Sequence, residues 1–142
     1  VDVGGKAETA RSAVATGRIR MSAEALAAIQ GGSGPKGDVL AAARIAGIMA
    51  AKKTAELIPL CHPIAIGGIE VGFDVVEEGF TVTVTVRTTE RTGVEMEAMT
   101  AAAVAGLTIY DMVKSTERGV TLTDVRLLKK SGGRSGLWQP DR

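Results

Sequence analysis

The chain has 142 residues, of which 45% are hydrophobic and 23% are charged, a composition typical of one folded domain that buries its own core. Its 17 basic and 16 acidic side chains give a formal net charge of +1, so the sequence lacks the positive excess that holds a nucleic acid. Charged residues interrupt the longest apolar run, and we therefore expect a soluble protein without a membrane-spanning helix.

The single cysteine, Cys61, excludes an intramolecular disulfide and fits a reducing, cytoplasmic compartment. Aromatic residues supply only 3% of the chain, which predicts a core of aliphatic and small side chains.

The first half of the chain predicts one strand and two helices. Residues 13–21 are expected to be extended, and Ser22 is a good N-cap for a short helix over residues 23–30. A glycine-rich loop, 31–37, follows. Asp38 is then expected to cap a helix over residues 38–57, because Pro59 forbids its continuation.

The second half changes to a period of two at Ile64. Two alternating runs, around 69–75 and 80–87, flank the turn Glu77-Glu78-Gly79 and predict an antiparallel hairpin. A helix over 94–114 and a strand over 120–128 follow, and the glycine-rich residues 131–136 are expected to form a mobile tail. This order predicts a single domain, residues 1–142, with an α+β, ferredoxin-like fold in which helices pack on one face of an antiparallel sheet.

The predicted helix over 94–114 is apolar around more than one stripe. One sheet cannot bury all of that surface, so either a second helix of the same chain or another subunit covers the remainder. We favour a second copy of the chain, because the protein is small.

Two loops carry candidate chemistry. Lys36, within Gly34-Pro35-Lys36-Gly37-Asp38, precedes a helix start that could attract a phosphate, although a connector with one solvated lysine also explains it. Leu60-Cys61-His62-Pro63 contains the only thiol and the only histidine. Two adjacent ligands do not build a metal site, so we expect none, and neighbours in sequence rarely form a nucleophilic pair. His62 could bind substrate, pass a proton or serve only the structure.

The helix over 94–114 has charged residues near both ends. Glu95 and Glu97 lie near its start, where the helix dipole stabilises carboxylates and where a carboxylate could also accept hydrogen bonds from a purine-like or pterin ring. Asp111 and Lys114, three residues apart, can form a surface ion pair or an acid–base couple. Glu97 and Asp111 are roughly 21 Å apart along the helix, so they can serve one small ligand only if they come from different subunits.

Lys129, Lys130 and Arg134 near the C-terminal end could clamp a triphosphate, or could form an ordinary basic tail.

Six ordered motifs together resemble the cyclic pyranopterin monophosphate synthase family, the C proteins of molybdenum cofactor biosynthesis. The motifs are Lys36-Gly37-Asp38-Val39, Ala43-Arg44-Ile45-Ala46-Gly47-Ile48, Leu57-Ile58-Pro59-Leu60-Cys61-His62-Pro63, Thr92-Gly93-Val94-Glu95-Met96-Glu97-Ala98, Leu107-Thr108-Ile109-Tyr110-Asp111-Met112 and Lys130-Ser131-Gly132-Gly133. The resemblance implies a ferredoxin-like subunit in a hexamer of three dimers, with active sites at the dimer interface. It implies a lyase that converts 3′,8-cyclo-7,8-dihydro-GTP to cyclic pyranopterin monophosphate and pyrophosphate.

The resemblance also implies roles for individual residues. Asp111 is then the active-site acid or base, with Lys114 and Lys36 as catalytic partners. The substrate-binding positions are Leu60, Cys61, His62, Glu95, Met96, Glu97, Lys130 and Arg134, the last standing where the family often has lysine. We expect Lys114 with Asp111 to handle protons, and Lys36, Lys130 and Arg134 to hold the triphosphate. No cofactor is required, and Mg²⁺ could accompany the triphosphate.

Two other functions compete with this interpretation. A non-catalytic regulatory module that binds a purine or pterin nucleotide would share the fold. An RNA-binding module would need exposed aromatic residues on its sheet, but Phe73 and Phe80 fall on the apolar faces of the two predicted strands.

Overall fold

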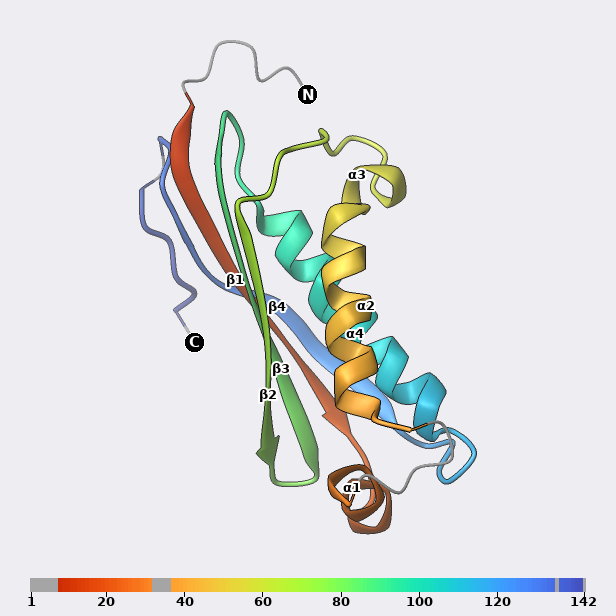
Figure 1. The fold of residues 1–142 in the computed structure, drawn as a ribbon. Coiled ribbons are helices and arrows are strands. Elements are labelled where there is room, and N and C mark those ends of the chain that lie inside the picture. Colours follow the sequence, from red (N-terminus) through yellow and green to blue (C-terminus); the bar gives the residue numbers. More distant parts are fainter. Residues whose placement is uncertain (1–7, 32–36, 135, 142) are drawn as a thin grey trace.

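The computed structural model describes residues 8–31, 37–134 and 136–141. Its elements follow the order β1 (Thr9–Arg20), α1 (Ala23–Gln30), α2 (Val39–Lys52), α3 (Thr54–Leu57), β2 (Gly68–Val76), β3 (Gly79–Glu90), α4 (Glu95–Val113) and β4 (Thr121–Ser131) (Figure 1). The strands form one sheet in the order β2-β3-β1-β4, with every pair antiparallel. This confirms the predicted α+β, ferredoxin-like fold and the hairpin of β2 and β3.

Helices α2 and α4 lie side by side on the same face of the sheet (Figure 1). Small residues allow this close approach: a Cβ at Gly47 would lie 3.2 Å from the backbone oxygen of Ala101 and 3.5 Å from the Cβ of Ala105. Helix α2 therefore covers much of the apolar surface of α4. This is the first of the two alternatives considered from the sequence, a second helix of the same chain. Leu107 of α4 stays 57% exposed, and its cover by a second copy remains a prediction.

The core lies between the helices and the two central strands. Ala13 and Ala15 of β1 pair with Val86 and Val84 of β3, and all four side chains are fully buried. Phe80 is also buried. Alanine opposite valine lets α4 approach the sheet, which explains how a chain so poor in aromatic residues fills its interior.

Both predicted helix caps are confirmed. The Ser22 hydroxyl accepts a hydrogen bond from the N–H of Ala25, and the Asp38 carboxylate accepts one from Ala41. The continuous helix predicted over residues 38–57 is wrong, however, because it breaks after Lys52. The buried Thr54 hydroxyl donates to the carbonyls of Ala50 and Ala51, and such back-bonding by threonine bends or interrupts helices.

The predicted last strand, 120–128, is too short, because β4 continues to Ser131 and includes Lys129 and Lys130. The Ser131 hydroxyl lies 2.6 Å from that of Ser12 on β1. The backbone of Lys130 also exchanges two hydrogen bonds with Trp138, at 3.0 and 2.8 Å. The lysines of this segment are thus held by the sheet.

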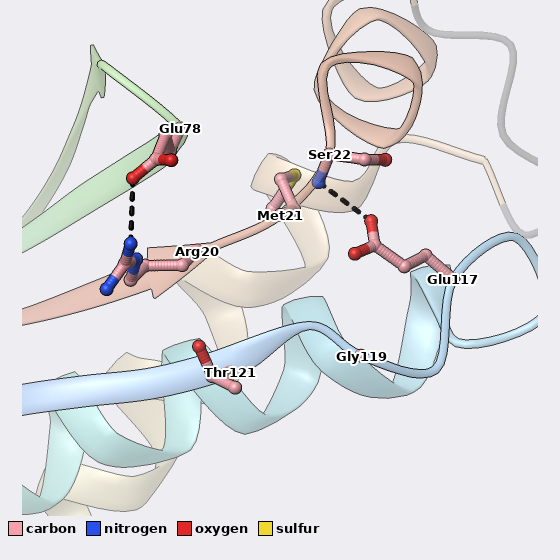
Figure 2. Close-up of a pocket in the computed structure, with 7 residues that line it drawn as sticks. All are labelled: Arg20, Met21, Ser22, Glu78, Glu117, Gly119 and Thr121. Carbon is pink, nitrogen blue, oxygen red and sulfur yellow. Dashed lines mark hydrogen bonds and ion pairs between the residues drawn. The ribbon is translucent and has the colours of Figure 1, made fainter.

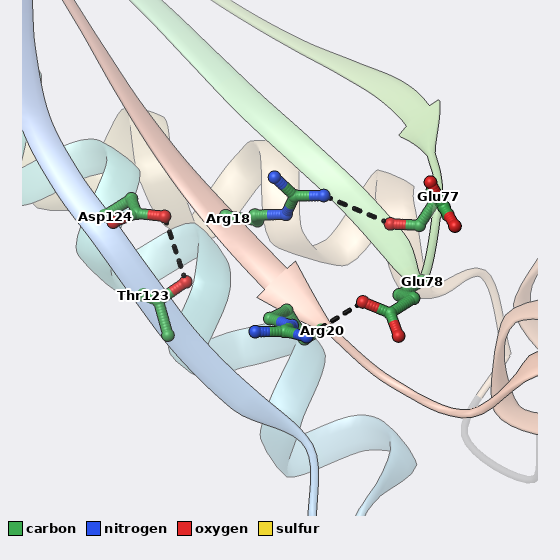
Figure 3. A network of polar contacts seen from close by, with 6 residues as sticks. All are labelled: Arg18, Arg20, Glu77, Glu78, Thr123 and Asp124. Carbon is green, nitrogen blue, oxygen red and sulfur yellow. Dashed lines mark hydrogen bonds and ion pairs between the residues drawn. The ribbon is translucent and has the colours of Figure 1, made fainter.

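Polar contacts secure the end of the sheet where β1 leads into α1. The backbone N–H of Ser22 donates to Glu117 at 2.8 Å, which ties the start of α1 to the segment after α4 (Figure 2). Beside it, Arg20 pairs with Glu78 at 2.8 Å, and Arg18 donates to the backbone oxygen of Glu77 at 3.2 Å (Figure 3). The described helices include none with the length and apolar character needed to cross a membrane.

Candidate active site

The charged residues singled out in the sequence form two clusters at opposite ends of α4. The first surrounds the start of the helix, where the segment after α3 brings Cys61 against it. The Cys61 thiol donates to Glu97 Oε2 across 3.6 Å. The Glu97 side chain is 3% exposed, and its Oε1 has no hydrogen-bond partner among the described residues. A buried acceptor without a partner is uncommon in folded proteins, and hydrogen bonding to a ligand is one reason for it.

Burial determines the protonation of both groups. Removal from water raises the pKa of Glu97, and the neighbouring Glu95 carboxylate adds to the shift. Burial, followed by the charges of Glu97 and Glu95, raises the pKa of Cys61 to about 11. Cys61 is therefore a thiol near neutral pH, which argues against a nucleophilic role because thiolates are the reactive species.

Glu95 points away from Glu97, as expected for two residues that are two positions apart on a helix. Its Oε2 accepts a hydrogen bond from Lys130 Nζ at 3.0 Å. The structure thereby joins β4 to the start of α4 and brings together four residues that the sequence singled out: Cys61, Glu95, Glu97 and Lys130.

A pocket of about 300 Å³ opens beside this ion pair. Three cationic side chains line it, Arg11, Lys130 and Arg134, together with Thr92, Gly93, Glu95 and Gly132. Sequence reasoning missed Arg11. Its side chain lies on β1, is 9% exposed and donates from Nε to the backbone oxygen of Glu90 at 2.8 Å. In the sequence, the one indication of this position was the alternation along the strand, which places Arg11 on the same face as the core-facing Ala13 and Ala15.

Two consecutive glycines shape this part of the chain: Gly132 lines the pocket, and Gly133 packs against the Arg11 side chain that also lines it. Gly132 and Gly133 both have positive φ angles, 89° and 75°, which favour glycine. A Cβ at Gly133 would lie 2.0 Å from Arg11 Nη1, and one at Gly132 would lie 2.1 Å from the backbone oxygen of Ala10. These glycines let the chain turn at the end of β4 while its backbone stays in contact with the Arg11 guanidinium.

The second cluster is the pair of Asp111 and Lys114 at the other end of α4. Lys114 Nζ lies 3.1 Å from Asp111 Oδ1, and the two side chains are 52% and 59% exposed. The predicted contact is confirmed, and in a single chain both side chains remain largely exposed to solvent. Glu95 and Asp111 are separated by roughly 24 Å along the helix, so one copy does not bring the two clusters together.

The remaining predicted residues have mixed environments. His62 is half-buried, Leu60 is 75% exposed and Met96 is 38% exposed. Lys36 lies outside the described residues. Within the described part of the chain, no three His, Cys, Asp or Glu side chains group closely enough to hold a metal ion.

Comparison with known proteins gives one consistent result. A sequence profile of the MoaC family matches residues 1–133. The cyclic pyranopterin monophosphate synthase of Novosphingobium aromaticivorans is 58% identical over 139 residues, which is 98% of this chain and 88% of that protein. Cyclic pyranopterin monophosphate synthase 2 of Mycobacterium tuberculosis H37Rv is 55% identical over 97% of this chain and 83% of its own. The cyclic pyranopterin monophosphate synthase of Streptomyces coelicolor is 53% identical over 97% and 81%, respectively.

Proposed function

The chain belongs to the MoaC family, and from this membership and the geometry of the site we propose that it is a cyclic pyranopterin monophosphate synthase. It is a lyase of molybdenum cofactor biosynthesis that converts 3′,8-cyclo-7,8-dihydro-GTP to cyclic pyranopterin monophosphate and pyrophosphate. One observation supports this substrate class above others. A pocket with three cationic side chains lies at the start of α4. Two residues along the helix from the Glu95 that lines it, Glu97 has a buried carboxyl oxygen without a partner among the described residues, a combination suited to phosphates joined to a nitrogen heterocycle.

The cationic pocket is the triphosphate subsite in this proposal. Arg11 and Arg134 carry planar guanidinium groups that match phosphate oxygens, and Lys130 adds a compact charge. Lys36 joins them on the strength of the family resemblance alone. Together they neutralise the charge that develops on the departing pyrophosphate.

The heterocycle lies against the Cys61–Glu97 contact in this proposal. Glu97 Oε1 accepts a hydrogen bond from a ring N–H or amino group, which satisfies the buried oxygen. His62, Leu60 and Met96 complete the wall, and the thiol of Cys61 keeps Glu97 oriented.

Asp111 and Lys114 carry the proton transfers in this proposal. Opening and closing the purine-derived rings needs an acid and a base within reach of the substrate. Since α4 separates this pair from Glu97 by about 21 Å, the pair must serve a site completed by a second chain. Contact with that chain also supplies the desolvation that the exposed pair lacks in one copy. We therefore propose dimers with sites at their interface, assembled as a hexamer of three dimers.

The Asp111→Asn variant tests this assignment, with pyrophosphate release as the measurement. We expect an intact assembly without turnover, and normal product formation by the variant contradicts the role of Asp111. Binding of the substrate by the wild-type protein without any release of pyrophosphate would instead favour a regulatory module.

A mixing experiment tests the composite site. Asp111→Asn and Lys130→Ala disable different clusters, so each protein alone is inactive. After the two are unfolded together and refolded in equal amounts, half of the dimers are mixed and contain one intact site, which predicts about a quarter of wild-type activity. Sites built from one chain each would recover none.

We also propose a cytoplasmic location, because Cys61 is a free thiol. Proton transfer and phosphate displacement can both be served by acidic, basic and cationic side chains, so we propose that no resident cofactor is needed. Full activity in EDTA would agree with this. Loss of activity that Mg²⁺ restores would assign a metal ion to the triphosphate.

A further inference from the structure

Glu95 is a carboxylate inside a pocket that otherwise suits anions. It lines the cavity with Arg11, Lys130 and Arg134, and its Oε2 lies 3.0 Å from Lys130 Nζ. The side chains of Lys130 and Glu95 are only 24% and 31% exposed, so solvent screens this ion pair less than a surface pair. Phosphate binding alone does not require such a residue, because a carboxylate repels phosphate.

The backbone is shaped to keep the Glu95 carboxylate where it is. A Cβ at Gly93 would lie 1.9 Å from Glu95 Oε1, so the side chain occupies space that only glycine leaves open. Glu95 Oε1 is buried and has no hydrogen-bond partner among the described residues. The carboxylate is therefore held in the pocket by shape and by Lys130, rather than by a full set of hydrogen bonds.

The charges decide what this arrangement does to a bound anion. The pocket has three cationic side chains and one carboxylate. An ammonium group has three donors, so Lys130 can bind Glu95 and a phosphate oxygen at the same time. A phosphate seated there feels the attraction of the cations and, within a few ångströms, the repulsion of a fixed negative charge.

We propose that Glu95 is a built-in counter-anion, which weakens the hold of the pocket on pyrophosphate and so speeds release of that product. This inference rests on the proposed function for the identity of the anion. It assigns Glu95 a positioning and charge-balancing role towards Lys130, distinct from contact with the heterocycle. A pocket without this carboxylate binds pyrophosphate more tightly and lets it go more slowly.

The test measures the dissociation constant of inorganic pyrophosphate by titration calorimetry, for the full-length wild-type protein and the Glu95→Gln variant. Glutamine keeps the shape and can accept from Lys130 but has no charge. We expect about tenfold tighter binding by Glu95→Gln at low salt, a difference that shrinks at high ionic strength. Glu95→Asp keeps the charge, and its dissociation constant should stay close to that of the wild type.

Glu24→Gln is the matched control, because Glu24 is an exposed carboxylate on α1, and it should leave pyrophosphate binding unchanged. Circular dichroism and thermal melting establish that each variant is folded. Unchanged or weaker binding by folded Glu95→Gln overturns the inference, as does equal tightening by Glu24→Gln. Should Glu95→Gln fail to fold, loosened binding by Glu95→Asp would overturn it and retained binding would support it. Calorimetry needs no turnover, so an inactive wild-type protein would refute the proposed function and leave this comparison intact.

Discussion

Replacement of Glu97 by glutamine should stabilise the protein at high pH. Glutamine has the same shape but cannot ionise. Burial raises the pKa of Glu97 above its ordinary value of 4.5. Stability that depends on the protonated carboxyl is therefore fully present below pH 4.5 and is lost as the pH rises through the elevated pKa of the folded state. Glu97→Gln escapes that loss.

The magnitude follows from burial and from the unpartnered oxygen. Glu97 is 3% exposed, and a buried polar group without a partner costs about 1–3 kcal/mol, or more when it is charged. We expect Glu97→Gln to raise the free energy of unfolding by about 1–3 kcal/mol at high pH, relative to its effect near pH 4. For a chain of this size each kcal/mol corresponds to roughly 2–4 °C in melting temperature.

Denaturant unfolding at both ends of the pH range measures the effect. Glu56→Gln removes an exposed carboxylate on α3 and should show no such pH-dependent gain. The reasoning is refuted if Glu97→Gln gains no stability as the pH rises. We expect the stabilised variant to lose turnover, because glutamine has one acceptor oxygen and an NH₂ donor, and so cannot accept both from Cys61 and from the substrate.

Three further outcomes follow from the geometry. Because the pKa of Cys61 is raised to about 11, iodoacetamide should label it slowly at neutral pH and faster as the pH rises. Glu97→Gln should raise the rate, and a fast reaction at neutral pH would contradict the burial argument. Gly132→Ala should lower the free energy of unfolding by at least about 2 kcal/mol in denaturant titrations, because its Cβ would meet a backbone oxygen at 2.1 Å. Gly136→Ala is its control, with positive φ but no atom within 4 Å of the added Cβ, and an equal loss in both would refute the steric reason. Glu117→Ala should speed amide hydrogen exchange in α1, because it removes the acceptor for the Ser22 N–H. Glu117→Gln keeps an acceptor oxygen and should restore the protection. Equal exchange in the wild type and both variants would show that this contact does not stabilise the start of α1.

The fold was predictable where the determining signal is local. Capping residues and the period of two are set by neighbours within a few positions, so α1, α4 and the β2–β3 hairpin matched expectation. The break after Lys52 was not predictable, because Thr54 interrupts the helix only through burial in the finished fold. The same holds for β4: its extension to Ser131 depends on pairing with Ser12, a partner more than a hundred residues away in sequence.

The candidate site was likewise predictable only where the sequence carries a local motif. Motifs singled out Cys61, Glu95, Glu97 and Lys130, and folding brings them together. Arg11 carries no motif, since one arginine in a strand is ordinary, and only the register of β1 places it in the pocket. The counter-anion role of Glu95 depends on its distance from Lys130, which the sequence cannot give.

Helix α4 is the basis of the proposed site shared by two chains, and its length indicates how the two chains dock in that proposal. Its buried face, rich in alanine, is used against α2 and the sheet, while Glu97 and the exposed Asp111 lie about 21 Å apart along its length. In an isologous dimer the same patch of each chain meets the other, so the start of one α4 can lie near the end of its partner. Two sites then form at once, each with a binding cluster from one chain and a proton-transfer pair from the other. In the proposed dimer, the distance between the two clusters along α4 therefore sets where the partner chain docks.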